Sequence, residues 1–206
     1  MTTIGFFGDS FCAGREPESW CKILAERLDA QIVNWGEPGR SIWTTFLKIQ
    51  KYLRKQKPLP DICVFCYTEP YRLYHPELIL SANTEPLPHV KPEIYETLDN
   101  YWKYLHYYDK DEIAYEYALK HFDKEVLPTL DREIIQMWSF KPFETANKDA
   151  GIKLQTGTFI DESMFEFSKK DGVEPGGWGP GTINHMTIDQ NNEWANKVYQ
   201  RYIRNG

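Results

Sequence analysis

The chain has 206 residues, of which 41% are hydrophobic and 26% are charged, with a formal net charge of -6. This length and composition predict one domain over residues 1–206 with a substantial buried core. The acidic balance argues against a broad phosphate-binding surface, so we expect no nucleic-acid partner. No stretch approaches the roughly 18 to 20 apolar residues of a membrane helix, and no apolar leader is visible, so we expect a cytoplasmic protein without a membrane partner.

The first third of the chain alternates between short apolar runs and segments with helical spacing. The runs predict strands at residues 3–8, 30–35 and 61–69, and the spacing predicts helices over about 17–29 and 42–53. Pro17 suits the first turn of the earlier helix. The basic run at 48–57 is best explained as the solvated side of the later helix. The alternation is typical of right-handed βαβ units.

From about residue 70 to 110 the sequence is rich in Tyr, Pro and His, which predicts a helical insertion with its best helix at 93–108. We interpret its aromatic residues as a small satellite core more readily than as a stacking surface, and the insertion as a lid. The remaining predictions are helices over 111–127 and 187–203 and strands at 132–140 and 151–161. The predicted fold is a three-layer α/β/α sandwich with a central parallel sheet, of the flavodoxin-like type.

The four cysteines are too few for a disulfide scaffold in a chain of this length. Cys63 and Cys66 form a C-x-x-C, but inside a predicted strand their side chains point to opposite faces. We therefore expect buried, reduced cysteines and no metal.

Three segments meet beyond the carboxyl ends of the predicted strands, where open parallel sheets bind ligands. They are Gly8-Asp9-Ser10, "NWGEPGRS" at 34–41, and Tyr67-Thr68-Glu69. Ser10 is the candidate nucleophile, and a serine hydroxyl needs a base within hydrogen-bond reach. Of the five histidines, His185 lies just before the last helix and is best placed to return to this edge.

These blocks resemble the motifs of the SGNH or GDSL hydrolases. The order of the predicted strands and helices also resembles that family over nearly the full length of the chain. The resemblance implies the SGNH-type fold, Ser10 as nucleophile, His185 as base and Gly39 as a backbone donor into an oxyanion hole. It implies hydrolysis of a small acyl, acetyl-like ester, with a small-molecule or O-acetylated carbohydrate substrate and no cofactor. Asp9 is expected to brace the turn.

Two positions depart from the family pattern. The third block usually reads Gly-x-Asn-Asp, and its asparagine side chain is the third oxyanion donor. This chain has Cys66-Tyr67-Thr68-Glu69 there, with the Thr68 hydroxyl as the candidate donor. Thr182 stands where an Asp-x-x-His motif has its acid. A backbone carbonyl is one way to hold the histidine. Through-space substitutes for the acid are Asp161, Asp171, Glu174 and Asp189. Losing one oxyanion donor typically costs about 10²- to 10³-fold in turnover.

Three further residues are candidates for contact with a substrate. Glu69 and Arg72 are three residues apart, and a local ion pair is the simpler expectation for them; Trp178 beside His185 suits an acyl or sugar contact or a loop anchor. The altered blocks leave a second hypothesis, a degenerate SGNH-like binding or structural module. A flavodoxin-like nucleotide binder is a third, weakened by the lack of a Walker or dinucleotide glycine pattern.

The "TEPYR" block at 68–72 also resembles SGNH-like proteins encoded by bacteriophages. That resemblance implies that the substrate is an O-acylated surface polysaccharide of a host and that lysis releases the protein. For the binding or structural module, it implies a place in a phage particle.

Overall fold

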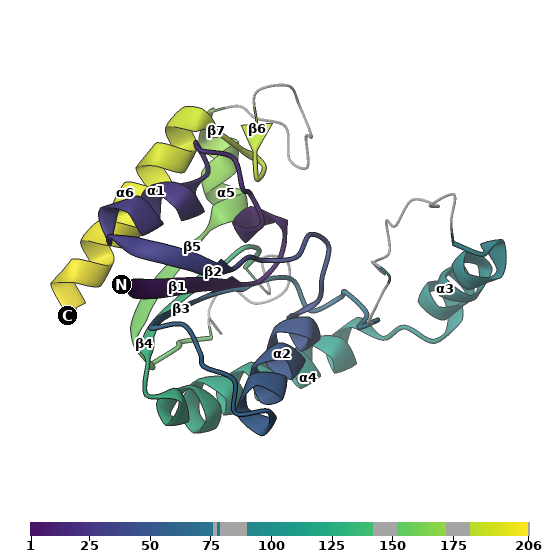
Figure 1. The fold of residues 1–206 in the computed structure, drawn as a ribbon. Helices are drawn as coiled ribbons and strands as arrows, with labels where there is room; N and C mark the ends of the chain where they lie inside the picture. Colours follow the sequence, from purple (N-terminus) through teal and green to yellow (C-terminus); the bar gives the residue numbers. More distant parts are fainter. Residues whose placement is uncertain (76–77, 79–89, 142–151, 172–181, 206) are drawn as a thin grey trace.

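The structure is a computed structural model of the 206-residue chain, and it describes residues 1–75, 78, 90–141, 152–171 and 182–205. Five parallel strands form the central sheet in the order β2-β1-β3-β4-β5 (Figure 1). They are β1 (Thr2–Phe7), β2 (Ala30–Asn34), β3 (Ile62–Tyr67), β4 (Glu133–Trp138) and β5 (Thr158–Ser163). The order reverses between β1 and β3, and ligands bind at such switch points beyond the carboxyl ends of the strands.

Helices cover both faces of the sheet (Figure 1). On one face lie α1 (Trp20–Arg27), the short α5 (Met164–Ser168) and α6 (Ile188–Asn205). On the other lie α2 (Ile42–Arg54) and α4 (Tyr108–His121). The predicted three-layer α/β/α sandwich with a central parallel sheet is confirmed.

Each face of the sheet has its own hydrophobic core. All six residues of β3 are buried, as expected for a strand that is covered on both sides. Cys66 belongs to the core under α1 and α6, and Cys63 to the core under α2 and α4. The two cysteines therefore point to opposite faces as predicted, and all four cysteines are free and buried.

The element boundaries differ from the predictions where a turn replaces the end of a helix or strand. Pro17 lies in a turn closed by the Ser19 N–H and the Glu16 carbonyl, 3.1 Å apart, so α1 begins only at Trp20. The strand expected at 151–161 is instead β5, and it starts after Gly157, whose φ is +70°. A Cβ at Gly157 would lie 2.2 Å from the Ile134 carbonyl oxygen, which explains the glycine.

The predicted helix over 111–127 is α4, which begins earlier and passes at its end into a π-helical turn, Phe122–Val126, and a 3₁₀ turn, Leu127–Leu130. The helix predicted at 93–108 is α3 (Pro92–Tyr104), which ends before α4 starts and extends away from the sandwich (Figure 1). The prediction of one domain with an insertion at about 70–110 stays a prediction.

A small aromatic cluster surrounds His106, in the segment that joins α3 to α4. The ring centroids of Trp102 and Tyr108 lie 4.3 and 4.2 Å from that of His106, and its Nε2 lies 2.9 Å from Asp111 Oδ2. These contacts agree with a satellite core in this part of the chain.

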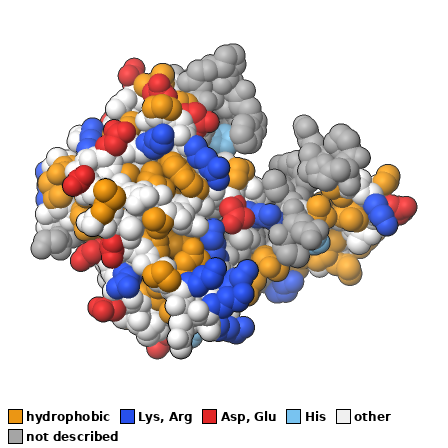
Figure 2. All heavy atoms as spheres, viewed as in Figure 1, with side chains coloured by type: hydrophobic (Ala, Val, Ile, Leu, Met, Phe, Trp, Pro, Cys, Tyr) orange, Lys and Arg blue, Asp and Glu red, His pale blue; other side chains and the backbone are white. Residues whose placement is uncertain are grey.

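The basic run at 48–57 lies on the solvent side of α2 and just beyond it, as predicted. Figure 2 shows Lys and Arg side chains gathered over this helix, and Lys51, Arg54 and Lys55 are exposed. Among the described residues, no helix is long and apolar enough to cross a membrane.

Candidate active site

The loop after β1 holds Ser10 in a tight turn at the carboxyl edge of the sheet. Ser10 is the first residue of a 3₁₀ turn, Ser10–Cys12, and Asp9 caps it by accepting the Phe11 N–H at 3.1 Å. Gly8 has no room for a side chain, since a Cβ there would lie 2.4 Å from the Cys66 carbonyl oxygen. Ser10 is partly exposed, whereas Asp9 is fully buried. The turn therefore presents the serine and hides the aspartate.

His185 lies at the tip of a two-stranded hairpin that the sequence did not predict. The strands are β6 (Thr182–Ile183) and β7 (Met186–Thr187), and Ile183 pairs with Met186 across a two-residue turn. Both turn residues have positive φ, +53° at Asn184 and +66° at His185, as type I′ hairpin turns require. This geometry brings His185 Nε2 to 3.0 Å from Ser10 Oγ.

The hairpin comes this close because Gly14 makes space for it. A Cβ on Gly14 would lie 2.4 Å from the side-chain amide of Asn184, the residue before His185. Gly14 closes the "FFGDSFCAG" stretch that contains Ser10. The same short stretch thus supplies the serine and the gap that admits the histidine turn.

Asn191 joins the hairpin to the helix that follows the serine turn. Its fully buried side chain accepts the Trp20 N–H at 2.9 Å, at the first residue of α1. Its amide donates to the carbonyls of Ile183, Met186 and Thr187 at 3.1, 3.2 and 2.9 Å. One carboxamide therefore satisfies backbone groups that are far apart in the sequence.

A capping box fixes where α6 begins, three residues after His185. The Thr187 N–H donates to Gln190 Oε1 at 2.9 Å, and the Gln190 N–H donates to Thr187 Oγ1 at 3.2 Å. These two hydrogen bonds join Thr187, at the end of β7, to the first turn of α6. They therefore fix the strand that follows His185 against the helix.

The loop after β2 is hydrogen-bonded to the serine turn and carries Gly39. The N–H groups of Gly36 and Glu37 donate to the carbonyls of Cys12 and Gly8 at 3.0 and 2.9 Å. Gly39 has a φ of +69° and lies in a turn in which the Arg40 N–H donates to the Glu37 carbonyl at 3.3 Å. Neither the Ser10 nor the Gly39 N–H donates a hydrogen bond to another described residue, so both are available to an acceptor.

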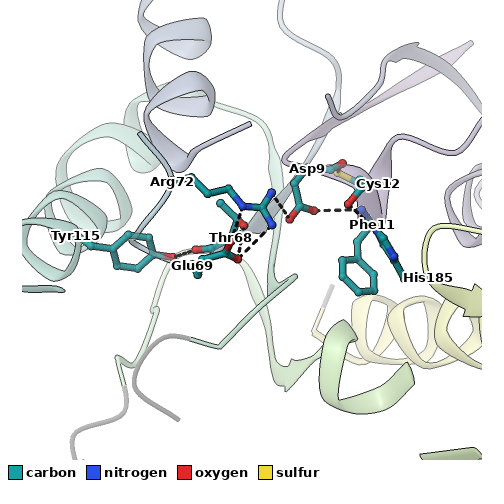
Figure 3. A network of polar contacts seen from close by, with 9 residues as sticks. Asp9, Phe11, Cys12, Thr68, Glu69, Arg72, Tyr115 and His185 are labelled. Atoms are coloured by element: carbon teal, nitrogen blue, oxygen red, sulfur yellow. Dashed lines mark hydrogen bonds and ion pairs between the residues drawn. The ribbon is translucent and has the colours of Figure 1, made fainter. Parts of the chain in front are cut away.

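Thr68 and Glu69 follow β3, and both are engaged within the protein (Figure 3). The Thr68 hydroxyl donates to Glu69 Oε2 at 3.0 Å, and the Thr68 carbonyl accepts the Tyr115 hydroxyl at 2.7 Å. Arg72 donates to Glu69 from Nε at 2.5 Å and from Nη2 at 3.2 Å. The predicted Glu69–Arg72 ion pair is thus confirmed, and the Thr68 hydroxyl proton points to Glu69.

Arg72 also reaches the aspartate beside the serine. Its Nη1 lies 3.5 Å from Asp9 Oδ2 (Figure 3). Its guanidinium lies over the Phe140 ring, 5.2 Å from the ring centroid. Burial raises the pKa of Asp9, and the positive charge of Arg72 partly opposes this. The Asp9 and Glu69 side chains therefore share the Arg72 guanidinium beside the turn that carries Ser10.

The pKa of His185 is lowered from its ordinary value chiefly because the imidazole is partly buried. The negative charge of Asp9 raises that pKa, and the positive charge of Arg72 lowers it further. The result favours a neutral imidazole near neutral pH, which is the form that accepts a proton from a hydroxyl.

The other carboxylates suggested by the sequence have different surroundings. Asp161, in β5, forms an ion pair with Lys141 at 3.2 Å, and Asp189 is exposed in the first turn of α6. Trp178, Glu174 and the side chain of Asp171 lie outside the described residues. In the part of the chain that the structure describes, no three His, Cys, Asp or Glu side chains group to hold a metal ion.

No protein-family model and no curated protein sequence match this chain. Solved structures do match its fold. The psychrotrophic esterase EstA from Pseudoalteromonas sp. aligns with a TM-score of 0.50 at 10% identity, covering 99% of this chain and 97% of that one. A lipolytic protein of the G-D-S-L family from Veillonella parvula DSM 2008 aligns with a TM-score of 0.50 at 14% identity, covering 99% and 100%. The chain has the fold of the SGNH hydrolases. At this identity, the likeness concerns the SGNH fold alone.

Sequence reasoning did not identify Gly14 or Asn191 as parts of the site. Asn191 stands in the polar run "DQNN", which is a helix-start signal, but the run does not reveal which asparagine is buried. Its role depends on the contact with Trp20, 171 positions away, which no local sequence pattern indicates.

We predict that Asn191→Ala lowers the free energy of unfolding by about 2 kcal/mol, because buried carbonyls and the Trp20 N–H lose their partner. Urea unfolding of the wild type and the variant measures this loss. The matched control is Asn192→Ala, because Asn192 is exposed and its side chain donates to the Ile188 carbonyl of its own helix. Equal losses in the two variants would contradict the role given to Asn191.

Proposed function

We propose that this protein is a serine ester hydrolase that acts on small acyl esters through Ser10 and His185. The observation that carries the proposal is the 3.0 Å contact between His185 Nε2 and Ser10 Oγ, made at the switch point of the sheet. A serine hydroxyl gains nucleophilic character from such a base. The natural substrate class is an acyl ester of a small alcohol or of a carbohydrate hydroxyl.

In the proposed reaction, neutral His185 takes the proton of the Ser10 hydroxyl as Oγ attacks the ester carbonyl carbon. The carbonyl oxygen gains the negative charge of the tetrahedral intermediate. The protonated imidazole then gives its proton to the alcohol oxygen as the ester bond breaks. Water attacks the resulting acyl-serine with the same histidine as base, which releases the acid and restores Ser10.

The backbone N–H groups of Ser10 and Gly39 are the proposed donors to the developing oxyanion, since neither is used by another described residue. Thr68 supplies a third donor only if its hydroxyl turns from Glu69, to which it now donates. Glu69 in this scheme orients Thr68 and Arg72 at the edge of the substrate site. Asp9 braces the serine turn and contributes its negative charge when His185 becomes positive.

A second candidate function is a catalytically inactive module that binds its ligand at the same edge. The arrangement of Thr68 favours it, because the asparagine of the usual third block is absent and the threonine hydroxyl is engaged by Glu69. Loss of one oxyanion donor typically slows an enzyme about 10²- to 10³-fold. Covalent labelling of Ser10 separates the two functions.

We predict that the purified protein hydrolyses p-nitrophenyl acetate and that Ser10→Ala lowers kcat at least about 10³-fold, because the acyl-serine no longer forms. Mass spectrometry after treatment with a fluorophosphonate is expected to find one adduct, on Ser10. EstA, which shares the fold, is described as inhibited by monoethylphosphonate, which recommends a phosphorus-based probe.

The control for this experiment is Ser168→Ala, which removes a buried serine hydroxyl that donates to the Phe165 carbonyl. It should keep the adduct and the hydrolysis. No turnover and no adduct in the wild type would reject the esterase and favour the binding module.

We also predict that kcat/KM rises with pH with a midpoint below 6.5, because burial lowers the pKa of His185 and only neutral His185 accepts the proton. In Asp9→Asn the midpoint should move to lower pH, since the charge that raises this pKa is lost while the amide oxygen still accepts the Phe11 N–H. Exposed Asp99 gives the control, Asp99→Asn. A midpoint that stays in place or rises in Asp9→Asn would contradict the assigned coupling.

A further inference from the structure

A cavity of about 380 Å³ lies between α2, the segment that follows β3, and α4, and Arg72 is one of the residues that line it. Its volume falls within the range of small-molecule pockets in proteins. Its apolar lining consists of Trp43, Leu47, Pro70, Leu73, Tyr74 and Ala114. Both Leu47 and Tyr74 are more than two-fifths exposed, so a ligand there would remove apolar surface from water.

The charged residues at this cavity are compensated within the protein. Arg72 lines the cavity and is paired with Glu69 and Asp9. Asp111 also lines it and is paired with His106 at 2.9 Å and Lys110 at 3.3 Å. Because Arg72 and Asp111 are paired within the protein, the remaining lining residues offer a ligand an apolar surface. It is suited to a hydrocarbon group and poorly suited to an ionic one.

Arg72 connects the cavity to the site, because it lines the cavity and its Nη1 lies 3.5 Å from Asp9 Oδ2. Figure 3 shows Arg72, Glu69 and Thr68 on one side of Asp9 and His185 on the other. Arg72, which lines the cavity, therefore lies across Asp9 from His185.

The direction of proton transfer determines which half of an ester lies on each side. His185 must give its proton to the alcohol oxygen, so the alcohol half lies beside the imidazole. The acyl half then points away from His185, toward Arg72 and the cavity. This step rests on the proposed esterase function, with Ser10 as nucleophile.

We propose that this cavity is the acyl-binding pocket and that it selects esters whose acyl group is an unbranched or aromatic hydrocarbon longer than acetyl. An acetyl group reaches little past the carbonyl carbon and leaves the lining exposed. Each further methylene that enters the cavity is buried, which raises kcat/KM about fourfold. The acyl pocket narrows the substrate class without changing the chemistry at Ser10.

The test measures kcat/KM for p-nitrophenyl acetate, butyrate, hexanoate and octanoate, and for acetates of alcohols of increasing length. Leu47→Trp and Ala114→Phe fill the cavity from α2 and from α4. Each should lower the hexanoate-to-acetate ratio about tenfold. The matched control is Leu53→Trp, because Leu53 is also on α2, is 42% exposed where Leu47 is 43%, and does not line the cavity.

A wild-type preference for hexanoate that both filling variants remove, with Leu53→Trp unchanged, is the expected result. Ratios that stay equal in all variants, with Ser10-dependent acetate hydrolysis intact, would overturn the acyl pocket alone. A change confined to the alcohol series would overturn it as well, by assigning the cavity to the other half of the ester. Absence of any Ser10-dependent hydrolysis would overturn the proposed esterase function and the acyl pocket together.

Discussion

The site depends on one buried carboxamide. Ser10 and His185 are 175 residues apart in sequence, and they lie within 3.0 Å of each other because Asn191 links α1 to the hairpin that carries His185. A carboxamide suits this position since it accepts with one atom and donates with the other, so groups of both kinds are satisfied without a buried charge. Gly14 completes the link by leaving space for the turn.

The sheet order determines where the candidate site lies. Because β1 and β3 are neighbours at the switch point, the segments after them meet at one edge, and a side chain from each can share a partner. Arg72 is that partner, between Asp9 after β1 and Glu69 after β3. A buried guanidinium between two carboxylates compensates charges that would otherwise be costly to bury, and it ties the serine turn to the segment after β3.

The sequence was informative wherever a local pattern determined the structure. The continuous apolar run of β3 and the glycine-flanked Ser10 depend on near neighbours and on strand length, so their places at the sheet edge were predictable. His185 was recognised by its position before a capped helix, but its hairpin was not, because Asn-His is an unusual pair for a turn with two positive φ values. The burial of Asp9 and the cavity beside Arg72 arise from packing between distant segments, which no periodicity records.

The electrostatics behind Ser10 bear on the missing acid at position 182. During the proposed reaction His185 becomes positive, and a carboxylate usually stabilises that charge. Asp9 is the buried negative group that raises the pKa of His185, whereas burial and Arg72 lower it. A neutral imidazole at rest and a nearby negative charge in the transition state are both what a general base needs. In the proposed reaction, Asp9 thus contributes part of what the acid of an Asp-x-x-His motif would provide, and Arg72 limits how large that contribution is.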